Sequence, residues 1–126
     1  MTFGIIGSGA FGTALLISLS STNEKLILWT RNQDVVNSVQ EIRENRLRLP
    51  GYILPQNIIV TNDINQMENC SIILIAVPMQ QLRSVVELHR SRLEGKILVA
   101  CCKGFEVSTG LGPLQSLRWH QIRQQY

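Results

Sequence analysis

A short apolar run followed at once by a glycine-spaced hexapeptide constrains this chain more than any other feature. Residues 2–6 are mostly apolar, which is typical of a strand buried on both faces. The pattern G-x-G-x-x-G follows at Gly7, Gly9 and Gly12. Apolar residues then recur at helical spacing, at Phe11, Ala14, Leu15 and Leu19. A strand, a glycine turn and a helix in this order are the setting in which the pattern holds the pyrophosphate of a dinucleotide.

Each of the three glycines has its own physical reason in such a site. We expect Gly7 to permit the tight turn, Gly9 to let the backbone approach a pyrophosphate, and Gly12 to let the helix pack against the strand. The free N–H groups at the start of the helix would then face the phosphates. The alternative is that these glycines serve only a compact strand-to-helix turn. A P-loop is excluded, because neither Lys-Ser nor Lys-Thr follows the glycines.

The rest of the chain alternates short apolar runs with helical patterns. Strands are expected at residues 25–29, 58–61, 71–77 and 96–101. One helix is expected behind Asn32 as N-cap, with its apolar stripe at Val35, Val36, Val39 and Ile42. A further single helix, closed by Gly95, is expected from the stripe at Leu82, Val85, Val86, His89 and Leu93. Strands that alternate with helices predict an α/β fold, a doubly wound parallel sheet of the Rossmann type in one domain.

The residues at the strand ends are the candidates for ligand contacts. An NAD-specific site would place an acidic residue about twenty residues beyond the glycines, whereas this chain has Arg31 followed by Asn32. Arg31 can pair with a ribose 2′-phosphate or stack on adenine, so we expect NADPH to be accepted. Pro78 follows the fourth strand, where the nicotinamide half would pass, and Lys103 follows the fifth, where a cation could hold a substrate phosphate or hydroxyl. The alternative for both Arg31 and Lys103 is that they are ordinary surface residues. His89 is expected to be packed rather than catalytic.

Composition and charge exclude several classes of protein. The 126 residues are 44% apolar and 17% charged, which fits one folded domain, and a net charge of +3 without a long basic run argues against a nucleic-acid binder. Residues 1–23 are uncharged but contain four glycines and no basic start, so neither a membrane span nor a signal peptide is expected. The three cysteines, with Cys101 and Cys102 adjacent, indicate a reducing compartment, and their spacing predicts no metal site. We therefore expect a cytoplasmic protein.

Five segments, taken together and in order, resemble the amino-terminal domain of the NAD(P)-dependent glycerol-3-phosphate dehydrogenases. They are GSGAFGTAL at 7–15, LWTRN at 28–32, NRLRLPGYILP at 45–55, AVP at 76–78 with LR at 82–83, and KGFEVSTG at 103–110. The resemblance covers residues 2–110. It implies an oxidoreductase that interconverts dihydroxyacetone phosphate and sn-glycerol 3-phosphate with NAD(P)H and feeds phospholipid synthesis. We expect the strand order 3-2-1-4-5.

The resemblance also implies roles for matching positions. Ala10 and Phe11 would contact the nucleotide within the glycine turn, Arg31 and Asn32 its adenosine half, and Lys103 both the nicotinamide and the substrate. The family's general acid/base lysine belongs to a helical substrate domain that has no counterpart in these residues. No catalytic residue is therefore expected here, and residues 1–126 should bind the nucleotide without turnover.

We predict a dinucleotide-binding domain over residues 1–110 and an atypical basic tail, with a short helix, over 111–126. The expected partner is a small phosphate-bearing substrate, and a homodimer stays open. Two alternatives remain, a dehydrogenase of the 6-phosphogluconate or hydroxy-acid type and a non-catalytic nucleotide-sensing module. The proline-bearing loop at 49–55 favours the glycerol-3-phosphate enzymes over the other dehydrogenases.

Overall fold

A computed structural model describes residues 2–22 and 24–101 of the chain. Its sheet consists of β1 (Phe3–Ile6), β2 (Leu26–Trp29), β3 (Ile58–Thr61), β4 (Ile72–Ile75) and β5 (Ile97–Ala100). Its helices are α1 (Ala10–Leu19), α2 (Gln33–Ile42), α3 (Leu82–Leu88) and α4 (Arg90–Leu93). Three short 3-10 helices are η1 (Ser20–Thr22), η2 (Ile64–Met67) and η3 (Met79–Gln81). Lys103 and the predicted tail at 111–126 lie outside the described residues.

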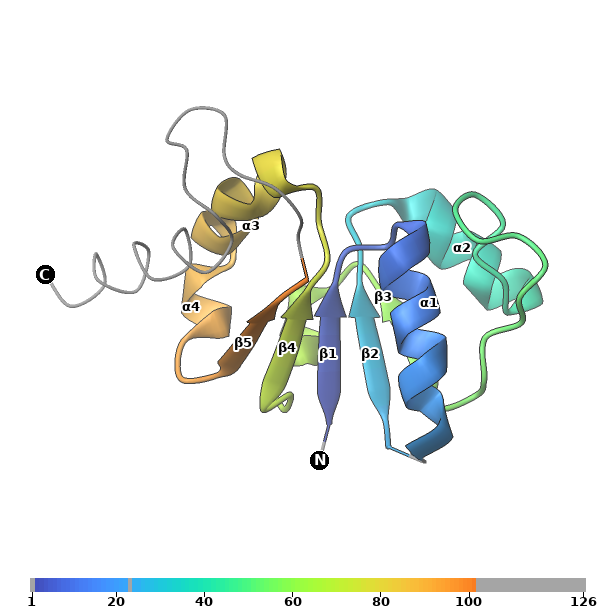
Figure 1. The fold of residues 1–126 in the computed structure, drawn as a ribbon, viewed down its shortest axis with the longest axis horizontal. Helices are drawn as coiled ribbons and strands as arrows, with labels where there is room; N and C mark the ends of the chain where they lie inside the picture. The colour runs from blue at the N-terminus through green and yellow to red at the C-terminus, as the bar shows by residue number, and fades with distance from the viewer. Residues whose placement is uncertain (1, 23, 102–126) are drawn as a thin grey trace, which may run out of the picture.

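The five strands form one parallel sheet in the order β3-β2-β1-β4-β5 (Figure 1). The predicted fold class and strand order are thus confirmed. Register places the last residue of β1, Ile6, opposite Trp29 of β2 on one side and Ile75 of β4 on the other. The carboxyl ends of these three strands are therefore level, and the chain leaves each of them at the same edge of the sheet.

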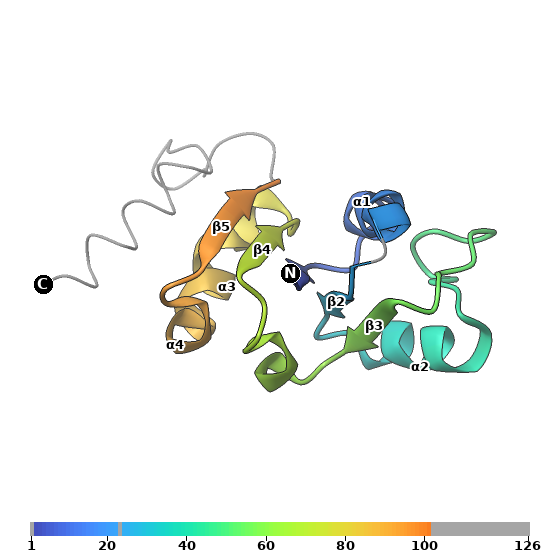
Figure 2. The same cartoon turned by 90° about the horizontal axis from the view of Figure 1, so that it is seen from below.

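Each face of the sheet is covered by its own apolar cluster, which is what a doubly wound sheet requires. On one face Ile6, Trp29 and Ile75 pack with Leu82 and Val86 of α3. The other cluster joins β1, β2 and β3 to α1 and α2 through Ile5, Leu16, Leu26, Leu28, Val35, Val39 and Ile58. Figure 2 shows α1 and α3 on opposite sides of the sheet.

Helix α1 buries a different face from the one that apolar spacing predicts. Phe11 is 58% exposed and Ala14 is exposed, whereas Gly12, Thr13 and Leu16 are buried. The helix is apolar almost all round, so apolarity alone does not select its buried side. The close approach of its first turn to β1 and β4 selects small residues instead, as the geometry at Gly12 shows below.

The predicted helix over residues 82–93 is divided at His89, where φ is −106° and ψ is 18°. The inward stripe nevertheless continues through the break, because the His89 N–H still donates to the Val85 carbonyl at 3.1 Å and the Leu93 N–H to the His89 carbonyl at 3.1 Å. Leu82, Val85, Val86, His89 and Leu93 are all buried as expected. The spacing of apolar residues predicts which side chains face inward, but it does not predict a local change in the backbone dihedral angles.

Helix α2 begins as predicted, since the Asn32 side chain accepts a hydrogen bond from the Asp34 N–H at 3.0 Å. The helix ends at Ile42 with Arg43 as its C-cap, and an irregular loop leads from there to β3. Arg43 closes this loop by donating from Nη2 to the carbonyls of Pro55 at 2.5 Å and Ile58 at 2.8 Å. The loop residues 43–57 thereby fold back against the sheet and become part of the domain.

Candidate functional site

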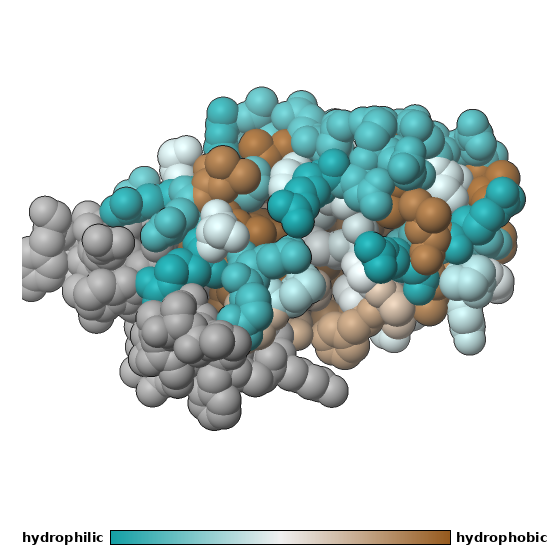
Figure 3. Space-filling view, turned by 90° about the horizontal axis from the view of Figure 1, so that it is seen from above, coloured by the Kyte–Doolittle hydropathy of each residue, from teal (hydrophilic) through white to brown (hydrophobic). Residues whose placement is uncertain are grey.

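A cleft lies where the strand order reverses, at the carboxyl ends of β1, β2 and β4. In open α/β sheets this switch point is the usual place for a ligand. The cleft encloses about 620 Å³ and is lined by Gly7, Ser8, Gly9, Trp29, Thr30, Arg31, Asn32, Arg48, Ala76, Val77, Pro78, Gln81, Val85, Leu88 and His89. Figure 3 looks onto the carboxyl-end side of the molecule, where hydrophilic and hydrophobic surface alternate. Such a mixture suits a ligand with charged phosphates and flat rings.

The glycine turn is built as tightly as its spacing predicts. Gly7 has φ +117°, and a Cβ added there would lie 2.5 Å from the Ala76 carbonyl oxygen at the end of β4. A Cβ added at Gly12 would lie 2.9 Å from the Gly7 carbonyl oxygen. Both positions therefore require glycine so that β1, β4 and α1 can meet.

Gly9 differs from the other two glycines because nothing in the described chain requires it. Its φ of −66° and ψ of 175° are open to any residue, and an added Cβ would meet no atom within 4 Å. Gly9 is the N-cap of α1 and lines the cleft. The first N–H groups of a helix have no partner within the helix, and they carry its positive dipole end. The space over Gly9 can thus admit a phosphate close to these donors.

Hydroxyl groups connect the glycine turn to the end of β2. The Ser8 and Thr30 hydroxyl oxygens lie 2.8 Å apart, and Thr30 Oγ1 also accepts the Asn32 N–H at 3.0 Å. This contact fixes the glycine turn relative to the residues that follow β2. The sequence gives no signal for this contact, because Ser8 and Thr30 are 22 positions apart.

Two arginines contribute positive charge to the cleft. Arg31 is exposed and donates from Nη2 to Gln81 Oε1 at 3.4 Å, which joins the end of β2 to η3. Arg48, from the loop that follows α2, also lines the cleft and was missed by the sequence argument. Its only available signal was its place in the proline-bearing 45–55 segment. The pair suits an anionic ligand at this rim.

The floor of the cleft includes a buried aromatic pair. The Trp29 and His89 rings pack edge to face with centroids 4.4 Å apart, and Trp29 Nε1 donates to the Asn62 carbonyl at 3.0 Å. Burial lowers the pKa of His89 below its usual value. His89 Nε2 is buried without a hydrogen-bond partner among the described residues. This arrangement fits the packed role that the sequence indicates for His89.

The structure brings together most of the residues predicted for nucleotide contact. Gly7, Gly9, Arg31, Asn32 and Pro78 all line the cleft. Ala10 and Phe11 are exposed on the first turn of α1 outside this lining, and Gly12 is buried beneath the turn. In residues 2–22 and 24–101, no group of three or more His, Cys, Asp or Glu side chains could hold a metal ion.

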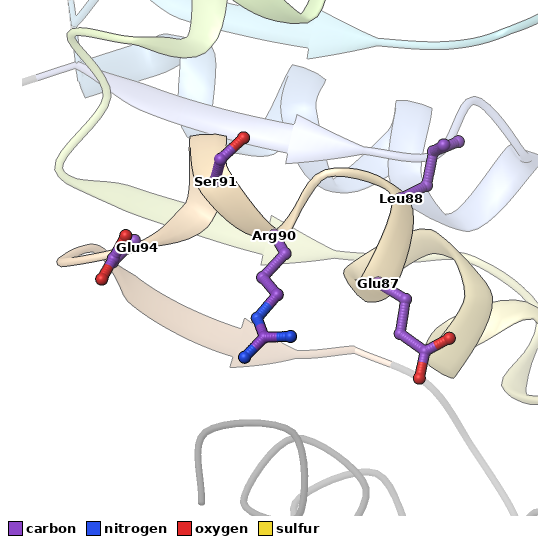
Figure 4. Close-up of a pocket in the computed structure, with 5 residues that line it drawn as sticks. All are labelled: Glu87, Leu88, Arg90, Ser91 and Glu94. Atoms are coloured by element: carbon purple, nitrogen blue, oxygen red, sulfur yellow. The ribbon is translucent and has the colours of Figure 1, made fainter. Parts of the chain in front are cut away.

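A second hollow of about 370 Å³ lies on α3 and α4 (Figure 4). It is lined by Glu87, Leu88, Arg90, Ser91 and Glu94. Figure 4 shows Glu87 and Arg90 directed to one side and Leu88 to the other. Acidic and basic groups alternate here, and no glycine turn offers backbone donors, so the cleft at the strand ends is the better candidate for a dinucleotide.

A sequence profile for the NAD-dependent glycerol-3-phosphate dehydrogenase N-terminus matches residues 2–120. The chain belongs to this family. Among its relatives is the glycerol-3-phosphate dehydrogenase [NAD(P)+] of Ruegeria sp., 47% identical over 118 residues that make up 94% of this chain and 37% of the relative. The Neisseria gonorrhoeae enzyme of the same name is 38% identical over 120 residues, which are 94% of this chain and 36% of the relative. The chain thus spans little more than a third of the length of these dehydrogenases, and the resemblance drawn from its motifs is confirmed.

Solved structures of glycerol-3-phosphate dehydrogenases share the fold. The enzyme from Coxiella burnetii superposes with a TM-score of 0.78 at 28% identity, over 85% of this chain and 34% of that one. The enzyme from Saccharomyces cerevisiae also gives 0.78, at 23% identity over 96% of this chain and 39% of that one. No helix within residues 2–22 and 24–101 is both long and apolar enough to cross a membrane.

Proposed function

We propose that this chain is the cofactor-binding part of a glycerol-3-phosphate dehydrogenase and that it binds NAD(P)H in the cleft at the ends of β1, β2 and β4. The observation that carries the proposal is the unfilled space over Gly9, directly before the first N–H groups of α1. A phosphate needs both the approach and the donors. Membership of the family supports the same assignment.

Different residues would bind different parts of the cofactor. We assign the pyrophosphate to the glycine turn, comprising Gly7, Gly9, Ala10, Phe11 and Gly12. Arg31 and Asn32 would bind the adenosine half, and the Arg31 guanidinium would donate hydrogen bonds to the 2′-phosphate of NADPH. Pro78 would lie along the nicotinamide half.

The substrates we propose are dihydroxyacetone phosphate and sn-glycerol 3-phosphate. When bound, the cofactor supplies or accepts the hydride. We propose that Lys103 contacts the nicotinamide and holds the substrate through its cation. The general acid that protonates the reduced carbonyl is assigned to a part of the relatives that these residues do not cover, so no catalytic residue is proposed within them.

We further propose that the dinucleotide-binding domain spans residues 1–110, that residues 111–126 form a separate basic tail, and that the protein works in the cytoplasm. The odd number of cysteines, with Cys101 and Cys102 adjacent in the sequence, supports a reducing compartment. A homodimer and the absence of nucleic-acid partners stay predictions.

Calorimetric titration of residues 1–126 with NADH and NADPH tests the proposal. Saturable binding of one molecule per chain is expected, and a control titration with AMP separates adenine binding from dinucleotide binding. Absence of heat up to millimolar cofactor would contradict it. A nucleotide-sensing module would bind the cofactor equally well. In that case even a full-length form of the protein would not reduce dihydroxyacetone phosphate.

A further inference from the structure

Asn45 is a fully buried polar residue of the loop after α2, and its side chain reaches the glycine turn. Its Nδ2 donates to the Ser8 carbonyl oxygen and to Thr13 Oγ1, each at 3.0 Å. Its Oδ1 accepts the Arg48 N–H at 3.3 Å. Both amide hydrogens and the amide oxygen therefore have partners, which fixes the orientation of the side chain.

These contacts determine where the Ser8–Gly9 peptide points. The Ser8 carbonyl is held towards Asn45, and Thr13 Oγ1 donates to the same oxygen at 3.4 Å. In a trans peptide the C=O and N–H groups point in opposite directions, and no peptide bond described here is cis. The Gly9 N–H is therefore directed away from Asn45, while Ser8 and Gly9 both line the cleft.

We propose that Asn45 is a positioning residue for the dinucleotide, which holds the Ser8 carbonyl so that the Gly9 N–H faces the pyrophosphate. This inference rests on the proposed function. The same side chain acts at a second point of the cleft, because its Oδ1 and the Asn45 carbonyl both accept the Arg48 N–H, each at 3.3 Å. One buried amide thus sets the glycine turn and the backbone of a cationic residue at the rim.

Asn57, which is half-buried, provides a control for the loss of a side-chain amide that makes two hydrogen bonds. Like Asn45 Nδ2, its Nδ2 makes two hydrogen bonds, here to the carbonyl oxygens of Ser20 at 3.0 Å and Glu24 at 2.8 Å. These partners precede β2 and lie at the opposite end of the sheet from the cleft. Replacing Asn57 removes a comparable pair of hydrogen bonds without touching the glycine turn.

The experiment compares wild type, Asn45→Leu and Asn57→Leu, because leucine resembles asparagine in shape but cannot donate. For each protein, melting temperature, NADP⁺ affinity by calorimetry and the amide resonance of Gly9 in a ¹⁵N correlation spectrum are measured. Both variants should melt lower than wild type. Only Asn45→Leu should bind NADP⁺ roughly tenfold more weakly or worse, as expected when one hydrogen bond to a charged group is misdirected. Only Asn45→Leu should shift the Gly9 resonance.

The outcomes separate the inference from the proposed function. If wild type does not bind NADP⁺, the proposed function fails and the inference fails with it. If wild type binds and Asn45→Leu binds within twofold of it, or both variants lose affinity equally, the inference alone is overturned. If Asn45→Leu does not fold, Thr13→Val removes the second donor to the Ser8 carbonyl, and it should weaken NADP⁺ binding at least threefold; unchanged affinity would overturn the inference.

Discussion

Replacing Gly9 by valine separates ligand binding from folding more cleanly than any other change at the glycine turn. The backbone at Gly9 is extended, and an added Cβ meets no atom within 4 Å. Loss of a glycine N-cap costs a few tenths of a kcal/mol to about 1 kcal/mol, whereas the reduced freedom of the unfolded chain returns about 0.4–1 kcal/mol. The free energy of unfolding should therefore change by less than about 1 kcal/mol, or about 4 °C in melting temperature for a chain of this size.

Cofactor binding should respond quite differently. The branched side chain would occupy the space through which a pyrophosphate reaches the first N–H groups of α1. We expect NADPH affinity to fall by about a hundredfold, the loss of two charge-assisted hydrogen bonds of about 1.4 kcal/mol each. Gly7→Ala serves as the contrasting variant, because its φ of +117° and a Cβ 2.5 Å from the Ala76 oxygen should destabilise the fold itself by at least about 2 kcal/mol.

The assay is a titration of nicotinamide fluorescence for each variant, with thermal unfolding followed by circular dichroism. A Gly9→Val protein that melts near wild type and no longer binds supports the assignment of the phosphate site. Equal NADPH affinity in Gly9→Val and wild type would refute it. A large loss of stability in Gly9→Val would show that the apparent space is needed by the folded chain itself.

Arg31→Ala should weaken NADPH binding roughly tenfold and leave NADH binding nearly unchanged, since only NADPH carries the 2′-phosphate; calorimetry checks this against Arg92→Ala on α4, and an equal loss for both cofactors would favour stacking on adenine. Burial lowers the pKa of His89, so the unfolded chain takes up a proton at a higher pH than the folded chain, and the free energy of unfolding should fall as pH drops from about 6.5 towards the lowered pKa. His89→Phe, compared by urea unfolding at pH 7.5 and 5.5, should lose less stability over this range than wild type, and identical losses would contradict the argument. Residues 1–126 should bind NADPH without oxidising it when dihydroxyacetone phosphate is added, because general acid catalysis alone contributes about 10²–10⁴-fold; absorbance at the nicotinamide band checks this, and turnover within a hundredfold of a full-length relative would show that the chain holds its own acid.

Features that depend on local pattern were predictable from the sequence. The turn at Gly7 and the Asn32 cap both follow from residue type and spacing over a few positions. The strand order depends on pairing between distant strands, and it was expected together with the resemblance to the dehydrogenase family. The buried face of α1 could not be predicted from the sequence, because a helix that is apolar all round gives no periodic signal. The exposure of Phe11 depends instead on how closely Gly12 approaches the Gly7 carbonyl. Local sequence pattern therefore does not predict features that depend on tertiary contacts.

The cleft shows the same division. The glycine spacing and Arg31 identify its phosphate-binding character from sequence alone. Asn45 joins it by hydrogen bonds to Ser8 and Thr13, which lie 37 and 32 positions away in the sequence. Arg48 joins it because its N–H is held by the turn at Asn45. No spacing rule links residues so far apart when the intervening loop is irregular, so only the folded chain reveals them.

The central claim, that the cleft at the ends of β1, β2 and β4 binds the dinucleotide, is tested most directly by mapping amide shifts. A ¹⁵N-labelled sample of residues 1–126 is titrated with NADP⁺, and each backbone resonance is followed. The largest shifts should fall on Ser8, Gly9, Arg31 and Asn32. The hollow at 87–94 on α3 and α4 should stay unchanged apart from Leu88 and His89, which also line the cleft. Shifts concentrated at Glu87, Arg90 and Glu94 with none at Gly9 would contradict it.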